Sequence, residues 1–175
     1  MIFTEMAVEG AYVIDIEPHE DSRGFFARMW DAEEFAARGL ESSIAQCSLS
    51  YNEKKGTLRG MHYQAAPHEE VKIVRCIRGA IFDVVLDLRE GSKSHGRWEA
   101  AELSAENRRS LYIPSGVAHG FQTLAADTEV FYAINTRHVF EAARGVRWDD
   151  PKFAIQWPET DHRTMSLRDQ TFELS

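Results

Sequence analysis

The sequence has little cysteine, no long apolar run and no excess of basic charge, and each shortage argues against a class of protein. Its two cysteines, Cys47 and Cys76, fit neither a metal-binding nor a redox spacing, so we interpret both as ordinary strand or core residues. No apolar run is long enough for a membrane helix, and the N-terminus lacks the basic start and apolar centre of a signal peptide. We therefore expect a cytoplasmic protein without a membrane segment. The formal charge of −8 argues against nucleic-acid binding, which depends on neutralising many phosphates.

What is present indicates one soluble globular domain that spans residues 1–175. Hydrophobic residues make up 43% of the chain and charged residues 27%, a balance typical of soluble domains. We find no internal repeat, low-complexity stretch or linker, and 175 residues are enough to close a single core.

Short β segments interrupted by Gly, Pro and Asn extend from about residue 43 to 148. The pattern is clearest in 71–88, which predicts two strands joined across Arg78-Gly79-Ala80. Further strands are expected at 97–103, 110–113, 119–124 and 128–135. Helices are expected at 31–38, where Asp31 can cap the first turn, and after Trp157-Pro158. The sequence thus predicts a mainly β fold, a cupin-type jelly-roll barrel with a few short peripheral helices. An immunoglobulin-like sandwich is the alternative, but the two cysteines lack its spacing and context.

Seven histidines raise the question of a metal site. Metal-binding cupins carry His-x-His on one strand, a carboxylate shortly after it, and a third histidine in Pro-x-Gly-x-x-His. The last element is present at 114–119 (PSGVAH), but His62 is followed by Tyr63 and Gln64, and His68 lies in a proline-containing loop. A stable site needs three or four well-placed ligands, so we expect no catalytic metal.

Three other segments carry residues suited to chemistry. The stretch 58–64 (LRGMHYQ) places Arg59 and His62 next to a glycine that lets a ligand approach the backbone. Lys72 interrupts an apolar strand, and Tyr132 lies in another. Each residue also has an ordinary interpretation: His62 as a hydrogen-bonded core histidine, Lys72 as an edge lysine that points to water, and Tyr132 as packing.

Taken in order, the segments resemble the dTDP-4-dehydrorhamnose 3,5-epimerase family of deoxysugar biosynthesis, with the spacing between blocks retained over nearly the whole chain. The matching blocks are 21–26 (DSRGFF), 55–64 (KGTLRGMHYQ), 72–75 (KIVR), 79–89 (GAIFDVVLDLR), 113–121 (IPSGVAHGF), 129–132 (EVFY), 145–151 (GVRWDDP) and 155–158 (IQWP).

The resemblance implies a jelly-roll homodimer in which an N-terminal strand crosses to the partner. It implies a nucleotide-diphosphate 4-keto-deoxysugar as substrate, dTDP-4-dehydro-6-deoxy-D-glucose, inverted at C3 and C5 to dTDP-4-dehydro-L-rhamnose. It assigns catalytic roles to His62 as base, Asp169 as its acidic partner, Lys72 as stabiliser of the enolate and Tyr132 as the acid on the opposite face. It assigns substrate binding to Arg23, Phe26, Gln46, Arg59, His119 and Arg168, with Arg23 reaching the other subunit's site.

This set of groups suits inversion of a carbon next to a ketone. The carbon must lose H⁺ to a base on one face, leaving an enolate, and regain a proton from an acid on the other face. A histidine titrates near working pH, and a carboxylate behind it fixes its tautomer. A lysine stabilises charge that develops on the C4 oxygen. No metal or redox cofactor is required.

Two segments depart from the family pattern and leave other readings open. Residues 136–140 (TRHVF), including Arg137-His138, replace aromatics that stack near the nucleotide base in many relatives, and Ser48 stands where asparagine is frequent. The preferred nucleotide is therefore open. The alternatives are a single-centre epimerase on a related nucleotide sugar, a metal-dependent cupin oxygenase or isomerase, and a non-catalytic sugar-binding jelly roll.

Overall fold

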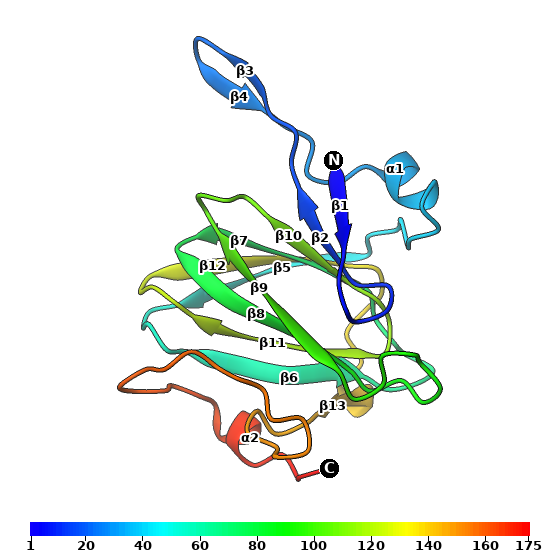
Figure 1. The fold of residues 1–175 in the computed structure, drawn as a ribbon, viewed down its shortest axis with the longest axis vertical. Coiled ribbons are helices and arrows are strands. Elements are labelled where there is room, and N and C mark those ends of the chain that lie inside the picture. The colour runs from blue at the N-terminus through cyan, green and yellow to red at the C-terminus, as the bar shows by residue number, and fades with distance from the viewer.

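The computed structural model describes residues 1–175 and consists mainly of two antiparallel sheets (Figure 1). The six-stranded sheet has the order β1 (Ile2–Glu5), β2 (Tyr12–Asp15), β10 (Ser110–Ile113), β7 (Lys72–Arg78), β12 (Thr128–Ile134) and β5 (Gln46–Asn52). The five-stranded sheet has the order β13 (Ala143–Gly145), β6 (Leu58–Gln64), β11 (Val117–Thr123), β8 (Ala80–Asp87) and β9 (Trp98–Ser104). The predicted mainly β barrel is confirmed.

The two sheets enclose the central core. Val74 and Leu111 from the six-stranded sheet pack with Ile81, Leu103 and further residues of the five-stranded sheet, and the four named residues have no exposed surface. Strands β7 and β8 are joined at Gly79 as predicted, but they do not pair with each other. The chain crosses between the sheets there. Gly79 has a positive φ of 76°, which glycine adopts readily, and the Thr128 side chain leaves no room for a Cβ at this position.

Each sheet is also covered on its outer face. The N-terminal segment and helix α1 (Ala32–Ala36) cover the six-stranded sheet, where Phe35 is fully buried against Ile73 and Tyr112. Asp31 caps α1 by accepting from two backbone N–H groups, so the predicted helix and its cap are confirmed. The C-terminal segment covers the five-stranded sheet and contains α2 (Leu167–Gln170), the second predicted helix; a short 3₁₀ turn spans Phe140–Ala142.

The structure contains a small hairpin near the N-terminus that we did not predict from the sequence. Strands β3 (His19–Asp21) and β4 (Gly24–Phe26) pair only with each other and project away from the barrel (Figure 1). All six of their residues are exposed, so no alternation of apolar and polar side chains marks them as strands. Phe26 at its base is 69% exposed.

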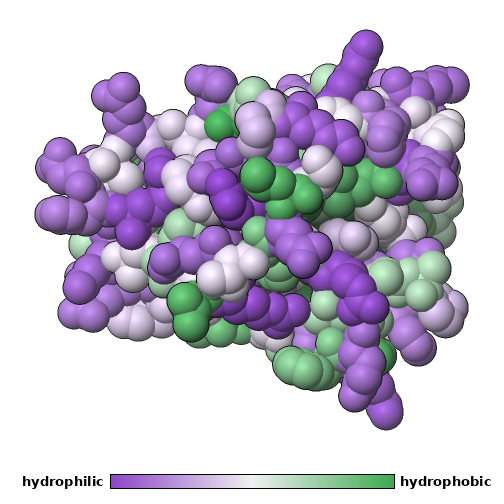
Figure 2. Space-filling view, turned by 90° about the horizontal axis from the view of Figure 1, so that it is seen from below, coloured by the Kyte–Doolittle hydropathy of each residue, from purple (hydrophilic) through white to green (hydrophobic).

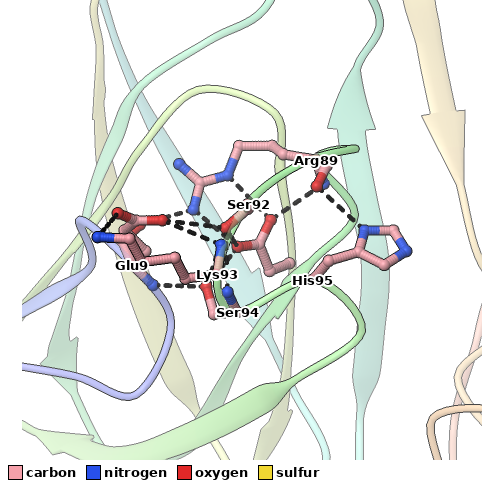
Figure 3. A network of polar contacts seen from close by, with 7 residues as sticks. Glu9, Arg89, Ser92, Lys93, Ser94 and His95 are labelled. Atoms are coloured by element: carbon pink, nitrogen blue, oxygen red, sulfur yellow. Dashed lines mark hydrogen bonds and ion pairs between the residues drawn. The ribbon is translucent and has the colours of Figure 1, made fainter.

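A polar network around Asp87 fastens the turn after β8 to the turn between β1 and β2 (Figure 3). The Arg89 guanidinium donates to both carboxylate oxygens of Asp87, at 2.9 and 2.8 Å, and to the backbone oxygen of Glu9 at 2.6 Å. Ser92 and Ser94 donate to the same carboxylate at 2.6 and 2.5 Å. Burial raises the pKa of Asp87, but these hydrogen bonds outweigh it and hold the pKa well below its usual range.

Seen from the side of the C-terminal segment, the surface is mostly hydrophilic, with apolar side chains in small separate patches (Figure 2). None of the helices has the length and apolar character required to cross a lipid bilayer.

Candidate active site

A cavity of about 640 Å³ opens between the two sheets beside α2. It is lined from strands β5, β6, β7, β11 and β12 and from the C-terminal segment. Seven predicted site residues line it: His62, Asp169, Lys72, Tyr132, Arg59, His119 and Arg168. The four predicted catalytic residues, which are as far apart in sequence as 62 and 169, therefore share one cavity.

The imidazole of His62 bonds to the carboxylate of Asp169, with 2.7 Å between Nε2 and Oδ1. His62 lies on β6 and Asp169 on α2, where the N-cap Ser166 accepts from the Asp169 backbone N–H. Burial raises the pKa of Asp169, but the hydrogen bonds from His62, from the Gly60 backbone and from Ser166 outweigh it and lower the pKa. The charged carboxylate accepts a hydrogen bond from the Nε2–H group of His62, which leaves Nδ1 as the unprotonated ring nitrogen.

A distortion of β6 at Gly60 places Arg59 and His62 in the same cavity. On a regular strand these residues face opposite ways. Here the register between β6 and β11 shifts, and a Cβ on Gly60 would lie only 2.4 Å from the Cα of Gly120. The two glycines thus bring the strands together where the register shifts. Arg59 Nε donates to Asn52 Oδ1 at 2.8 Å.

Lys72 is buried in the middle of a sheet, so its interpretation as an edge lysine in water is wrong. It lies on β7, between β10 and β12. Its ammonium is 2.7 Å from a carboxylate oxygen of Glu70, and both side chains are about nine-tenths buried, at 11% and 9% exposed. Glu70 also lines the cavity and was not predicted in the sequence, because Glu69-Glu70 before an apolar strand is typical of a solvated turn.

Tyr132 lies on β12 and shares the cavity with a second histidine–carboxylate pair. Its hydroxyl is 3.4 Å from Ser50 Oγ, and burial raises its pKa well above the usual range. The His119 ring meets the Tyr132 ring edge-on, with 6.4 Å between centroids. His119 Nε2 lies 2.5 Å from Oδ1 of Asp83, a residue without exposed surface. Burial raises the pKa of Asp83, although His119 and Lys72 oppose the shift.

Asp83 was also missed, although the sequence contained a signal for it. It and Asp87 interrupt the apolar strand β8, and an aspartate buried in a strand requires a partner. Asp87 bonds to Arg89 and the two serines, and Asp83 bonds to His119.

Three of the predicted binding residues do not line the cavity. Arg23 and Phe26 lie on the projecting hairpin, where Arg23 pairs with Asp21 at 2.5 Å. Gln46 accepts from the backbone N–H of His138 at 2.8 Å and so holds the 136–139 loop at the cavity rim. Their roles in substrate binding stay predictions.

No group of three or more His, Cys, Asp and Glu side chains is arranged to hold a metal ion. His62 and His119 each bond to a separate aspartate. The structure therefore does not provide the three or more grouped ligands that a metal-dependent cupin requires.

A cupin-like barrel whose cavity holds a histidine–aspartate pair, a lysine and a tyrosine defines an acid–base enzyme of the isomerase kind. The family model for dTDP-4-dehydrorhamnose 3,5-epimerase matches residues 5–174. The chain belongs to this family, as its sequence indicated.

Similar proteins support the assignment along the whole chain. A curated dTDP-4-dehydrorhamnose 3,5-epimerase from Sinorhizobium fredii is 37% identical over 171 residues, which cover 98% of this chain and 88% of the relative. The solved Bacillus anthracis enzyme, with TDP and PPi bound, is 34% identical with a TM-score of 0.94 and 99% of each chain covered. The Legionella pneumophila enzyme, in complex with dTDP-4-keto-L-rhamnose, is 32% identical with a TM-score of 0.92, covering 99% of this chain and 92% of that one.

Proposed function

We propose that this protein converts dTDP-4-dehydro-6-deoxy-D-glucose to dTDP-4-dehydro-L-rhamnose by inverting C3 and C5. The observation that carries the proposal is the His62–Asp169 pair, which shares one cavity with Lys72 and Tyr132. Membership of the family and the ligand of the Legionella relative support the choice of substrate.

In the first step, His62 removes a proton from the carbon next to the C4 ketone. The C–H electron pair moves to form the enolate, and negative charge develops on the C4 oxygen. Asp169 stabilises the imidazolium that forms, because its lowered pKa keeps it charged. The ammonium of Lys72 stabilises the enolate oxygen.

In the second step, Tyr132 delivers a proton to the opposite face of the same carbon. Burial raises the pKa of its phenol, so the group keeps its proton until the enolate takes it. The phenolate and the imidazolium then return to their starting protonation states by exchange with water. The same sequence at the second carbon completes the double inversion.

The nucleotide diphosphate requires positive charge, which the chain supplies locally despite its net charge of −8. Arg59 and Arg168 line the cavity, and guanidinium groups pair well with phosphate oxygens. His119 lines the deeper part, beside Tyr132.

We further propose that the enzyme is a homodimer in which the β3–β4 hairpin carries Arg23 and Phe26 to the partner's cavity. The hairpin projects from the barrel, and the edge strand β5 exposes Leu49 by 58% and Tyr51 by 51%. Light scattering should give about twice the mass of one chain, and Arg23→Ala should weaken substrate binding without dissociating the dimer. A monomer that retains full activity would contradict this proposal.

We propose a cytoplasmic location as well, which the free thiols of Cys47 and Cys76 support. Fractionation of the source cells tests it, and recovery of the enzyme with an extracytoplasmic fraction would contradict it.

The reaction is tested by incubating the proposed substrate with the enzyme in D₂O without added metal. We expect deuterium at both C3 and C5 and formation of the L-rhamnose configuration. Deuterium at C3 alone, with inversion at that centre, would identify a single-centre epimerase instead. No exchange at either carbon, with several nucleotide variants tried, would contradict the proposed function.

A further inference from the structure

The C-terminal segment that supplies Asp169 is attached to the barrel through the ring of Phe172. This ring occupies space that a glycine leaves open: a Cβ on Gly145 would lie 2.3 Å from Cζ of Phe172 and within 2.7 Å of two more ring atoms. Gly145 lies on β13, directly opposite His62 on β6. Any larger residue at position 145 would therefore push the ring away from the strand that carries the base.

The ring also contacts the base itself. The ring centroids of Phe172 and His62 are 5.9 Å apart with an interplanar angle of 69°, an edge-to-face arrangement. The guanidinium of Arg168 lies 5.6 Å from the centre of the same ring. Phe172 thus fills the space between the His62 imidazole, Gly145 and the side chain that precedes Asp169.

Apart from Phe172 and the bonds of Asp169, few contacts tie the segment 166–175 to the rest of the chain: the Ser175 backbone N–H donates to Asp150 Oδ2 at 2.6 Å, and Arg168 donates to the Ala143 carbonyl at 3.5 Å. Within residues 166–175, every residue is exposed except Asp169, which is buried, and Phe172, which is half-buried. Leu167, the only apolar residue of α2, is 75% exposed. A helix of four residues does not hold its position by itself, so packing must hold it.

We propose that Phe172, seated against Gly145, is a positioning residue for the catalytic base. It holds α2 so that Asp169 stays in bonding distance of His62 Nε2, which keeps the proton on Nε2 and leaves Nδ1 free. The kinetic part of this inference rests on the proposed function, whereas the effect on the histidine tautomer does not.

Phe172→Ala and Phe172→Leu test the role of the ring. The tautomer of His62 is read from the ¹⁵N shifts of its ring in the ligand-free enzyme, with the signals assigned by their loss in His62→Ala. We expect a single Nε2–H tautomer in the wild type and a mixture in both variants. We also expect kcat for epimerisation to fall about 10- to 100-fold with KM nearly unchanged, as for a displaced catalytic group. Leu167→Ala, which removes an exposed apolar side chain from α2 nearby in the same segment, is the matched control and should change neither quantity.

Gly145→Ala tests the same contact by changing the glycine instead of the ring. The added methyl should displace the ring and reproduce the tautomer mixture. In the double variant Gly145→Ala/Phe172→Ala no ring remains to be displaced, so its kcat should equal that of Phe172→Ala alone. Losses that multiply instead would show that the two residues act separately and would overturn the inference.

The other possible results for the Phe172 variants also decide whether Phe172 positions the base. A wild-type tautomer and kcat in both Phe172 variants would overturn the inference, and so would a lowered kcat with an unchanged tautomer. If Phe172→Ala does not fold, Phe172→Leu, which keeps most of the apolar volume, provides the comparison. A tautomer shift in the variants of an enzyme that lacks epimerase activity would refute the proposed function and leave the positioning role standing.

Discussion

His62 and His119 lie directly opposite each other on the neighbouring strands β6 and β11, and each bonds through Nε2 to a different aspartate. Their environments differ sharply. The His62 side chain is 39% exposed, whereas that of His119 is 5% exposed. The pKa of Asp169 is lowered, and burial raises the pKa of Asp83. The difference in exposure supports the proposal that His62, and not His119, exchanges a proton with substrate, while His119 lies in the cavity wall beside Tyr132.

Replacing His62 by Ala should abolish exchange at both sugar carbons. A positioned base contributes roughly 10²–10⁴ in rate, so the loss should be at least about 100-fold. Deuterium incorporation measured by NMR checks this, with unchanged circular dichroism as the control for folding. Ordinary exchange in this variant would mean that the base is another group.

Glu70→Gln should raise the exchange rate severalfold. The Glu70 carboxylate lies 2.7 Å from the Lys72 ammonium and opposes the negative charge that develops on the enolate, whereas the amide keeps a similar shape without the charge. Lys72→Met, in contrast, should lower kcat about 10²–10³-fold through loss of that stabilisation. Initial rates of both variants under saturating substrate give the comparison. A loss in Glu70→Gln as large as in Lys72→Met would assign the carboxylate a direct part in the reaction.

His119→Ala should destabilise the fold as well as impair catalysis, because it leaves the carboxyl of Asp83 buried without a partner. A cost of about 1–3 kcal/mol in the free energy of unfolding is expected. The double variant His119→Ala/Asp83→Ala should lose less than the sum of the two single variants, since neither group is then left unpaired. Urea unfolding at pH 7 measures these values, and strictly additive losses would argue against the pair.

Asp87→Asn should destabilise the protein by about 3 kcal/mol at neutral pH, as expected when one partner of a buried ion pair is removed. The pKa of Asp87 is lower in the folded than in the unfolded chain. Its stabilising effect is therefore fully present above roughly pH 4, the usual value for an unfolded aspartate, and is lost as the pH falls from there toward the folded pKa. Thermal midpoints of wild type and variant should thus converge in acid. A difference that is constant from pH 7 to pH 2 would contradict this account.

Much of the barrel could be predicted from sequence because its strands are buried and end at turn residues. Residues 71–88 carry this signal, and the boundary at Gly79 follows from it. The hairpin at 19–26 gave no such signal, because its side chains are exposed on both faces. Which sheet each strand joins depends on packing across the barrel, which is not encoded in any local pattern.

The residues of the site likewise fall into those that the sequence predicted and those that it did not. Resemblance to the family indicated His62, Asp169, Lys72 and Tyr132, and the fold brings all four into one cavity. Other residues of the site were missed. The contacts of Asp83 and Phe172 are made with residues distant in sequence, and Glu70 stands in a polar stretch that is typical of a solvated turn. Asp83 meets His119 from 36 positions away, and Phe172 meets Gly145 from another element altogether.

The central claim is that His62 and Tyr132 act on opposite faces of one sugar carbon. The most direct test is to incubate Tyr132→Phe with substrate in D₂O and to determine the configuration of the labelled sugar. If the two residues divide the faces, deuterium enters through His62 with retention, and the sugar recovered is labelled but not inverted. Inverted, labelled product at the wild-type rate would contradict the claim, because the second proton would then come from a group other than Tyr132.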